Sequence, residues 1–486
     1  MSSIIEQVFL YAEKCPEKIA LTDGKHDISY RDLCRQVLYA KQILLDEYQL
    51  KKGDAVILAA NKQLSFVSVY FACHLLEVIV LPLDPDINKK RLSLIAGRTE
   101  PKLAIGLNSE CLKCVKLGLD NFDDFVDGYK YDTIFFPGKE SIADIIFTTG
   151  TTGEPKGVTL SQKNIEAAAK NINTFIQNTS EDVEMLALPI SHSFGLGRLR
   201  CALSNGQTVV ILGSFANMKR FFRFMEEFKV TGFGMVPAGW AMIKKLSGLK
   251  IKEFAAQLNY IEIGSAPMPL EDKHLLIESL PNTRICMHYG LTEASRSAFM
   301  EFHEEKDYLD TIGKQSPNMY IEIRSESGEL VPDGEEGEIC VRGDAVTDGY
   351  YKLPEINKVS FWGVFFRTGD WGVKSADGHI RLCSRKKELI NVGGKKVSPL
   401  EIEELLLKIS YIDDCACIAI PDPDGVMGEV VKAYVVTSAP TLIEKDVLNR
   451  EIAPQIEDYK LPVEYEVIDE IPKTASGKVQ RLLLKK

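Results

Sequence analysis

Short apolar runs alternate with amphipathic segments of helical length through roughly the first 300 residues of the chain. Residues 55–59 and 78–82 have the composition of buried strands, and residues 64–76 between them have the length of a helix. The alternation returns at residues 185–188, 208–212 and 232–236. Strands separated by helices pair in parallel, so this order predicts a large α/β domain with mostly parallel central sheets.

The N-terminal segment predicts two helices and a hairpin. Residues 4–12 and 30–45 have helical spacing of apolar side chains. Residues 19–22 and 27–30 flank a turn at Gly24 and read as a β-hairpin between the helices.

Beyond about residue 311 the pattern changes to short strands and tight turns, among them residues 320–323, residues 338–341 and a hairpin turn at Asp377-Gly378. The end of the chain has its own alternation, long enough for a separate small core. Its predicted helices are residues 399–409 and 444–456, and its predicted strands are residues 416–420, 430–436 and 463–468. The fold class is therefore α/β, with a large multi-sheet N-terminal domain that includes a β-barrel-like subdomain, and a small α+β domain at the C-terminus. The sequence lacks a Ser/Pro-rich linker, so we expect a tight hinge between the domains rather than a tether.

Length and charge exclude some classes. A chain of 486 residues is too long for one hydrophobic core. The net charge of −11 does not supply the basic face that binding to nucleic acid needs. We expect no nucleic-acid partner.

Cysteines and hydropathy indicate the compartment. The eleven cysteines are scattered and mostly lie in apolar strings, as buried thiols in a reducing cytosol do. Cys111 and Cys114 have metal or redox spacing, yet no second pair completes a zinc set, and we interpret them as structural. No apolar stretch reaches the roughly 18 residues that span a bilayer. The expected location is cytoplasmic, without stable membrane insertion.

The first chemical motif follows an apolar run that begins at Ile146. Glycines, threonine hydroxyls and a lysine in a turn suit a phosphate, because they offer backbone N–H groups, hydroxyl donors and a positive charge. The residues concerned are Thr148, Thr149, Gly150, Thr151, Thr152, Gly153 and Lys156. The order excludes a Gly-x-x-x-x-Gly-Lys-Ser/Thr loop, since Glu154 follows Gly153. A plain turn between two elements explains the glycines equally well.

A second motif, His288-Tyr289-Gly290-Leu291-Thr292-Glu293, follows a predicted strand over residues 283–287. Tyr289 has a ring that stacks on a purine, Thr292 a donor for phosphate, and Glu293 a carboxylate for a hard cation such as Mg²⁺. Taken alone, the pattern favours a simple helix start.

Two further segments carry charges suited to a nucleotide. Asp370 ends Phe366-Arg367-Thr368-Gly369-Asp370, and a buried carboxylate can accept the hydroxyls of a ribose, although a Gly-Asp surface turn has the same sequence. Lys478 follows a Ser-Gly turn near the C-terminus, where a solvated tail charge is the alternative.

The order Thr-Thr-Gly-Thr-Thr-Gly-x-Pro-Lys-Gly resembles the nucleotide loop of the adenylate-forming superfamily, which contains acyl-CoA synthetases, luciferases and the adenylation domains of peptide synthetases. Tyr-Gly-x-Thr-Glu matches a second motif of that family. At least six such motifs occur in order between residues 148 and 478, so the resemblance covers nearly the whole chain.

The resemblance implies roles for individual residues. Gly264-Ser265-Ala266, after a strand over residues 260–263, would lie along the adenine and acyl pocket, and His288, Tyr289 and Gly290 would also contact the nucleotide. Asp370 would take the ribose hydroxyls and Arg385 would reach ribose and phosphate, although Cys383-Ser384 stand where glycine commonly precedes that arginine. Lys478 would bridge the substrate carboxylate and the α-phosphate.

The same resemblance places a hinge at Lys387, with an ATP- and acyl-binding domain over residues 1–386 and a mobile lid domain over residues 387–486. Rotation about Lys387 would withdraw Lys478 after the first reaction and bring the Gly393-Gly394 loop to the site. Glycines there would let a slender pantetheine arm pass close to the backbone.

The acyl side is harder to read. Ser191-His192-Ser193-Phe194-Gly195 resembles the family segment that walls the acyl pocket, with His192 where many acid ligases carry histidine, although a core histidine is the alternative. Relatives that activate amino acids place an aspartate in this region, and no acidic residue occurs between Leu186 and Gly206. The substrate should therefore lack an α-amino group, because a buried ammonium would remain unpaired. Residues 237–240 and 295–298 are candidates for the pocket floor, and Trp240 would shorten the pocket if its side chain pointed inward.

The leading hypothesis is an acid–thiol ligase. A small carboxylic acid and Mg·ATP would give acyl-AMP and pyrophosphate, and CoA would then displace AMP. The cofactors implied are ATP, Mg²⁺ held by Glu293, and coenzyme A. One alternative loads the acyl group onto the phosphopantetheine of a carrier protein, and another is a binding protein that has lost catalysis. The acid and the oligomeric state are not indicated.

Overall fold

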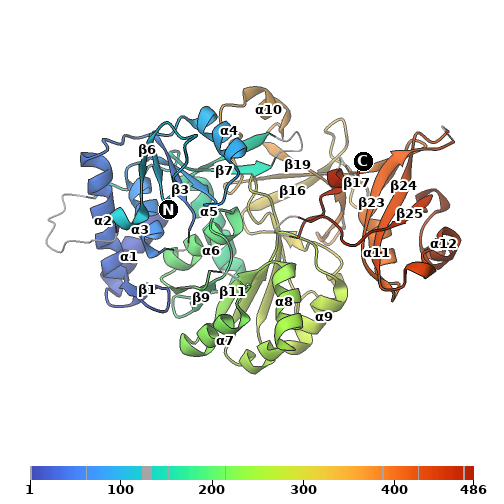
Figure 1. Cartoon of the computed structure of the whole chain (residues 1–486), viewed down its shortest axis with the longest axis horizontal. Helices are drawn as coiled ribbons and strands as arrows, with labels where there is room; N and C mark the ends of the chain where they lie inside the picture. The colour runs from blue at the N-terminus through green and yellow to red at the C-terminus, as the bar shows by residue number, and fades with distance from the viewer. Residues whose placement is uncertain are drawn as a thin grey trace. The chain divides into compact units, whose positions relative to one another are not determined.

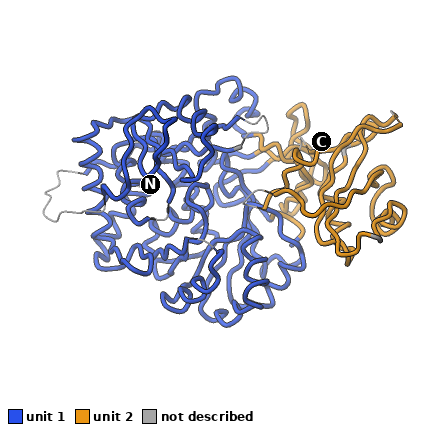
Figure 2. The backbone as a smooth tube through the Cα atoms, in the orientation of Figure 1, with its two compact units in different colours: residues 1–309, 313–321, 341–366 blue, residues 310–312, 322–340, 367–486 orange. Residues whose placement is uncertain are grey.

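The computed structural model describes residues 3–61, 63–122, 134–149, 154–213, 215–385, 388–424, 426–473 and 477–485. The chain divides into two compact units (Figure 2). Unit 1 comprises residues 1–309, 313–321 and 341–366, and unit 2 comprises residues 310–312, 322–340 and 367–486. The predicted hinge at Lys387 lies outside the described residues, so the boundary there stays a prediction.

Unit 1 begins with a helical layer packed on a sheet (Figure 1). Ser3 caps α1 (Ile4–Lys14) in a capping box with Glu6, and α1 packs on α2 (Tyr30–Asp46). The sheet has the order β6-β5-β3-β4-β7-β8 in the part of the chain that is described. Its strands are β3 (Ala55–Ala59), β4 (Ile79–Leu83), β5 (Leu103–Ile105), β6 (Val115–Leu117), β7 (Ile142–Thr149) and β8 (Pro155–Ser161), and the helices that connect them include α3 (Leu64–Leu75) and α4 (Lys89–Thr99). The strands run parallel except for β8, which pairs antiparallel with β7.

A second sheet of unit 1 has nine strands among the described residues, in the order β15-β14-β13-β12-β11-β9-β10-β1-β2. Neighbours from β1 to β13 along this order are parallel, whereas β2, β14 and β15 pair antiparallel. The strands are β1 (Ile19–Thr22), β2 (Asp27–Ser29), β9 (Val183–Leu186), β10 (Thr208–Ile211), β11 (Gly232–Met235), β12 (Tyr260–Ile263), β13 (Arg284–Tyr289), β14 (Ala298–Glu301) and β15 (Lys314–Gln315). The helices are α5 (Gln162–Ile176), α6 (Ser193–Ser204), α7 (Met218–Glu227), α8 (Pro237–Ser247) and α9 (Leu270–Ser279). The predicted α/β class with mostly parallel sheets is confirmed.

The two faces of this second sheet differ in chemistry. One face is apolar: Phe233 and Ile261 pack in one core with Phe221 of α7 and Trp240 of α8. Successive strand residues point to opposite faces, so the polar residues of the same strands, such as Glu262, lie on the other face.

A sheet of five strands, also counted over the described residues, comes next in the chain. Its strands are β16 (Met319–Arg324), β17 (Glu336–Gly343), β18 (Phe361–Trp362), β19 (Phe365–Lys374) and β20 (Ile380–Arg385), and α10 (Pro354–Val359) precedes β18. The chain passes between the units within β16, β17 and β19.

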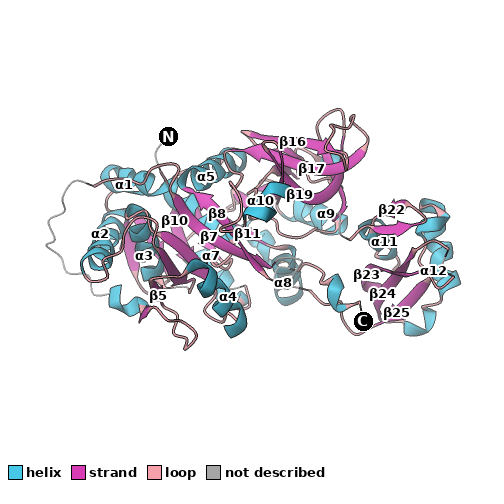
Figure 3. Ribbon diagram, turned by 90° about the horizontal axis from the view of Figure 1, so that it is seen from above, coloured by secondary structure: helices cyan, strands magenta, loops and turns pink. Residues whose placement is uncertain are grey.

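The rest of unit 2 is a small α+β core, seen in Figure 3. Ile402, Leu406, Val431 and Leu448 are among its buried residues. The elements are β21 (Ile390–Val392), β22 (Lys395–Val397), α11 (Pro399–Leu406), β23 (Ile412–Pro421), β24 (Glu429–Thr437), α12 (Lys445–Ile452) and β25 (Glu464–Val467). The predicted helix over 444–456 was too long, because Pro454 cannot donate the backbone hydrogen bond that would continue it. The helix expected over 399–409 likewise ends at Leu406.

Candidate active site

The threonine-rich turn joins two antiparallel strands. Thr148 of β7 pairs directly with Lys156 of β8. Gly150, Thr151, Thr152 and Gly153 lie outside the described residues, and only the backbone of Thr149 is described. The structure therefore describes the two strands that flank the turn, with Thr148 and Lys156 next to each other on adjacent strands.

Tyr350 connects this turn to the second motif. Its hydroxyl donates a hydrogen bond of 2.8 Å to Oε1 of Glu293, and the Nζ of Lys156 lies 5.2 Å from the centre of its ring. The backbone supports the contact, since Tyr350 bridges Val158 of β8 and the N–H of Thr347 donates to the carbonyl of Glu293 over 2.8 Å. Lys156 and Glu293 are thus held against one side chain, which the sequence analysis did not identify.

The segment from His288 to Glu293 does not start a helix. His288 and Tyr289 end β13, and a turn closed by hydrogen bonds between Leu291 and Ala294 leads toward β14. A Cβ on Gly290 would lie 2.5 Å from the N atom of Arg296, so the close turn needs glycine. The helix-start interpretation is wrong for this segment.

The predicted acyl wall meets the same turn. Ser193, at the start of α6, lies with its Oγ 3.4 Å from the Oγ1 of Thr292. His192 immediately precedes α6 and is exposed, so the alternative of a core histidine is wrong. Trp240 is fully buried in the apolar core with Phe233, so its side chain points into that core.

Gly264, Ser265 and Ala266 follow β12 directly. A Cβ on Gly264 would lie 2.1 Å from Cε1 of His288, so glycine allows the imidazole to pack against the backbone. Ser265 has a φ of 75°, a left-handed conformation that costs energy for a residue with a side chain. Such strain is concentrated at ligand sites.

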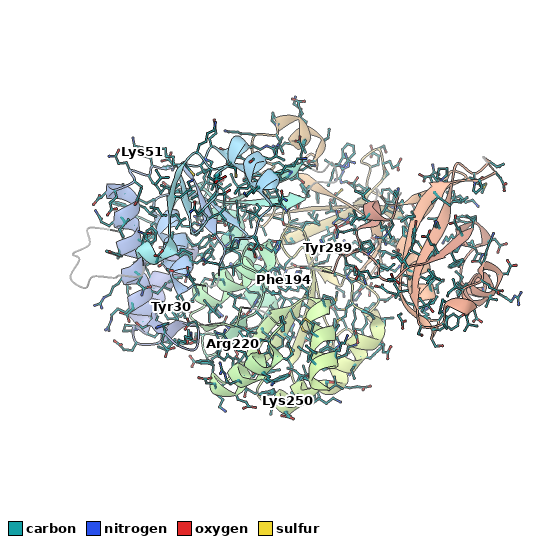
Figure 4. All side chains as sticks on the ribbon, viewed as in Figure 1. Tyr30, Lys51, Phe194, Arg220, Lys250 and Tyr289 are labelled. Atoms are coloured by element: carbon teal, nitrogen blue, oxygen red, sulfur yellow. The ribbon has the colours of Figure 1, made fainter. Side chains whose placement is uncertain are left out.

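Behind these segments lies a buried charged cluster centred on Glu262. Its carboxylate is 2.7 Å from Nδ1 of His288, 3.0 Å from Nε of Arg296 and 3.2 Å from Nη1 of Arg198. Arg198 in turn binds Glu184 through two hydrogen bonds of 2.8 and 2.6 Å. Figure 4 labels Phe194 on α6 and Tyr289 at the end of β13. Both of these elements contribute residues to the cluster.

The cluster sets the protonation of its members. Burial alone would raise the pKa of Glu262, but Arg296, His288 and Arg198 outweigh it and hold the pKa below its usual range. Burial lowers the pKa of His288 despite the neighbouring Glu262 carboxylate. Glu262 is therefore charged and His288 is neutral at pH 7.

Unit 2 holds the predicted ribose residues. Asp370 is only 3% exposed within β19, and its Oδ1 is 2.8 Å from Nε of Arg385, its direct partner on β20. The backbone N–H of Asp370 donates to the hydroxyl of Thr368 over 3.0 Å. The surface-turn interpretation of Gly369-Asp370 is therefore wrong.

Lys478 is exposed on a loop that the backbone closes between Pro472 and Gln480 with a bond of 2.8 Å. Arg481, just beyond, anchors this segment through Glu403 at 2.7 Å and Glu388 at 2.8 Å. The loop that carries Lys478 is therefore closed by a backbone hydrogen bond and anchored by the ion pairs of Arg481.

Gly393 and Gly394 form the turn between β21 and β22, with φ of 57° and 84°. Two successive positive φ angles in a two-residue hairpin explain why both positions are glycine.

Two family models match the chain. The AMP-binding enzyme model covers residues 8–351, and the AMP-binding enzyme C-terminal domain model covers residues 401–478. The chain therefore belongs to the AMP-binding enzyme family. This confirms the predicted resemblance to adenylate-forming enzymes.

Curated relatives and solved structures are also similar to this chain. An oxalate–CoA ligase from Arabidopsis thaliana is 27% identical over 100% of this chain and 98% of its own length. A sulfoacetate–CoA ligase from Cupriavidus necator is 32% identical over 72% of this chain and 67% of its own. The crystal structure of ATP-bound MatB from Rhodopseudomonas palustris matches with a TM-score of 0.88 and 25% identity, covering 98% of each chain. The predicted fold is confirmed, and the predicted class of enzyme, an AMP-forming acid–thiol ligase, is confirmed by these relatives.

Hydropathy adds one negative finding: within the described residues, no helix combines the length and apolarity that crossing a bilayer requires.

Proposed function

We propose that the chain activates a small carboxylic acid without an α-amino group as its acyl-AMP and transfers the acyl group to the thiol of coenzyme A. In the first step a carboxylate oxygen attacks the α-phosphorus of ATP and pyrophosphate leaves. In the second the thiol sulfur attacks the acyl carbon, the thiol proton is lost and AMP leaves. Membership of the family does not fix which acid is activated or which thiol accepts the acyl group, so both are proposals.

The observation that carries the proposal is the contact of Tyr350 with both Glu293 and Lys156. Lys156, next to the threonine turn, has the charge to stabilise departing phosphates. Glu293 offers a carboxylate to Mg²⁺, which prefers oxygen ligands and, when bound, offsets phosphate charge. The lysine suits the phosphates and the carboxylate suits Mg²⁺, so these two side chains beside Tyr350 fit a magnesium nucleotide.

Further residues bind the rest of the nucleotide in this proposal. Tyr289 and the segment Gly264–Ala266 contact the adenine, and Thr292 binds phosphate. In unit 2, Asp370 accepts the ribose hydroxyls, and Arg385, already paired with it, reaches ribose and phosphate. The Gly393-Gly394 turn admits the pantetheine arm, and Lys387 is the proposed hinge.

Lys478 provides the sharpest test of these roles, because it is assigned to the first step alone. Lys478→Ala should lower acid-dependent ATP–pyrophosphate exchange roughly 100-fold or more, since a charge that neutralises the transition state is lost. Conversion of supplied acyl-AMP and CoA to thioester should keep its wild-type rate. The adenylate used is that of an acid the wild type activates.

Lys473→Ala is the matched control, because Lys473 belongs to the same loop and pairs with Asp414. Both half-reactions should be unaffected in this control. Equal loss of both half-reactions in Lys478→Ala would show that Lys478 is not specific to adenylation.

A further inference from the structure

One carboxylate organises the loop between β23 and β24, whose described residues are 422–424 and 426–428. Asp422 accepts the backbone N–H of Met427 over 2.8 Å, that of Val426 over 2.9 Å and that of Asp424 over 3.2 Å. The bond from Met427, together with the other two, lowers the pKa of Asp422, so this side chain is charged at pH 7. A single side chain therefore sets the direction of three peptide groups in this loop.

The other side of the loop supports the turn between β21 and β22. The N–H of Gly393 donates to the carbonyl of Met427 over 2.8 Å, and the residue before Gly393, at the end of β21, bridges Gly428. The carboxylate of Glu429 accepts the N–H of Asn391 over 2.8 Å. Three successive residues at the start of the turn are thus bonded to three successive residues at the end of the loop.

The side chain of Met427 lies against the same turn. A Cβ on Gly393 would lie 2.9 Å from Cε and 3.2 Å from Sδ of Met427. At Gly394, by contrast, an added Cβ would have nothing within 4 Å among the described residues. The turn is therefore covered by Met427 at its first glycine and open at its second.

A turn of two glycines needs such support to keep one conformation. Glycine adopts positive and negative φ about equally well, so the values of 57° and 84° at Gly393 and Gly394 are not imposed by the residues themselves. The bonds to the loop restrict Gly393 from outside. A reacting group that passes this backbone depends on its position, because a misplacement of about 1 Å costs about 100-fold in rate.

Resting on the proposed function, in which the Gly393-Gly394 turn admits the pantetheine arm, we propose that Asp422 is a positioning residue for the second step alone. Its carboxylate holds the loop that presents Met427, and Met427 fixes the turn through both its carbonyl and its side chain. Asp422 acts through Met427 and not on the thiol or the acyl group. Attack of the thiol on acyl-AMP depends on this support, whereas attack of the carboxylate on ATP does not.

The test measures the two half-reactions separately with the purified full chain and an acid that the wild type activates. Conversion of supplied acyl-AMP and CoA to thioester reports the second step, and acid-dependent ATP–pyrophosphate exchange reports the first. Asp422→Ala should lower kcat/KM for CoA at least about tenfold, because the turn is displaced. Pyrophosphate exchange should stay within about twofold of the wild-type rate, which also shows that the variant is folded.

Asp424→Ala is the matched control. Asp424 belongs to the same loop, and its bond to Asp422 uses the backbone N–H, which the substitution keeps. Both half-reactions should be unaffected.

Asp422→Asn is the conservative variant. Its one amide oxygen still accepts the N–H groups of Val426 and Met427, so it should recover at least about half of the wild-type rate of thioester formation.

Met427→Ala gives a second readout, because it keeps the carbonyl bond to Gly393 and removes the side chain that covers it. KM for CoA should rise about threefold or more with KM for ATP unchanged. Unchanged thioester formation in Asp422→Ala or Met427→Ala, or equal loss of both half-reactions, would overturn the inference while leaving the ligase function standing. A wild-type protein that exchanges pyrophosphate but forms no thioester from acyl-AMP and CoA would instead overturn the proposed function.

Discussion

Tyr350 fixes the positions of two charged side chains that are far from it in sequence. It is 57 residues from Glu293, and it bonds the carboxylate through its hydroxyl while its ring faces the Lys156 ammonium. A carboxylate positioned by such a bond presents its remaining lone pairs in a fixed direction, which matters for metal geometry.

Tyr350→Phe should therefore weaken the binding of Mg²⁺ at Glu293. Loss of a hydrogen bond to a charged group costs about 1.5–3 kcal/mol, so the Mg²⁺ concentration for half-maximal pyrophosphate exchange should rise roughly tenfold. Tyr351→Phe, the same change one residue on, is the control and should leave that concentration unaltered. An unchanged magnesium dependence in Tyr350→Phe would show that the bond does not position Glu293.

At this residue scale the sequence predicted the motif residues but not their partners. Asp370 and Glu293 stand in recognisable local patterns, whereas Tyr350 has no motif around it. The buried cluster left a weaker signal: Glu184 and Glu262 are acidic residues inside otherwise apolar strands, and a buried carboxylate requires a cation. That signal predicts a partner but not which arginine supplies it.

Glycines of the second sheet show how an element is adapted to its neighbours. Gly232 of β11 faces Tyr260 of β12, and a Cβ there would lie 2.2 Å from the tyrosine ring. The ring occupies the space that a side chain at 232 would need, and its hydroxyl reaches the Glu184 carboxylate. Gly232 in β11 thus leaves room for the Tyr260 side chain of β12 and for its hydrogen bond to Glu184.

Gly232→Ala should destabilise unit 1 by about 1–3 kcal/mol through overpacking. Gly97→Ala is the matched control, because Gly97 is an exposed position of α4 with nothing within 4 Å of an added Cβ. That change should stabilise by about 0.5–1 kcal/mol, since alanine is the better helix residue. Calorimetric melting temperatures should move in opposite directions, and two shifts of the same sign would contradict the packing account.

Element types were more predictable than element ends. The strand predicted at residues 55–59 coincides with β3, a run of five buried apolar residues that begins directly after the polar Asp54. Residues 444–456 kept helical periodicity beyond the actual end of α12, and the backbone requirement at Pro454 overrode it.

For the whole molecule, the order of motifs predicted the family, and the family models confirm it over both parts of the chain. Local sequence could not predict which side chains meet at Thr292, because Ser193 comes from α6 and Thr292 from the turn after β13.

The activity proposed for this chain is ligation of an acid to coenzyme A through an acyl-AMP. The direct measurement supplies wild-type protein with Mg·ATP and an acid that supports pyrophosphate release, then adds either free CoA or a holo-carrier protein and follows AMP and thioester. AMP and acyl-CoA formed in equal amounts with free CoA are the predicted result. Thioester and AMP formed with the holo-carrier alone would contradict the claim and identify a carrier-loading ligase instead.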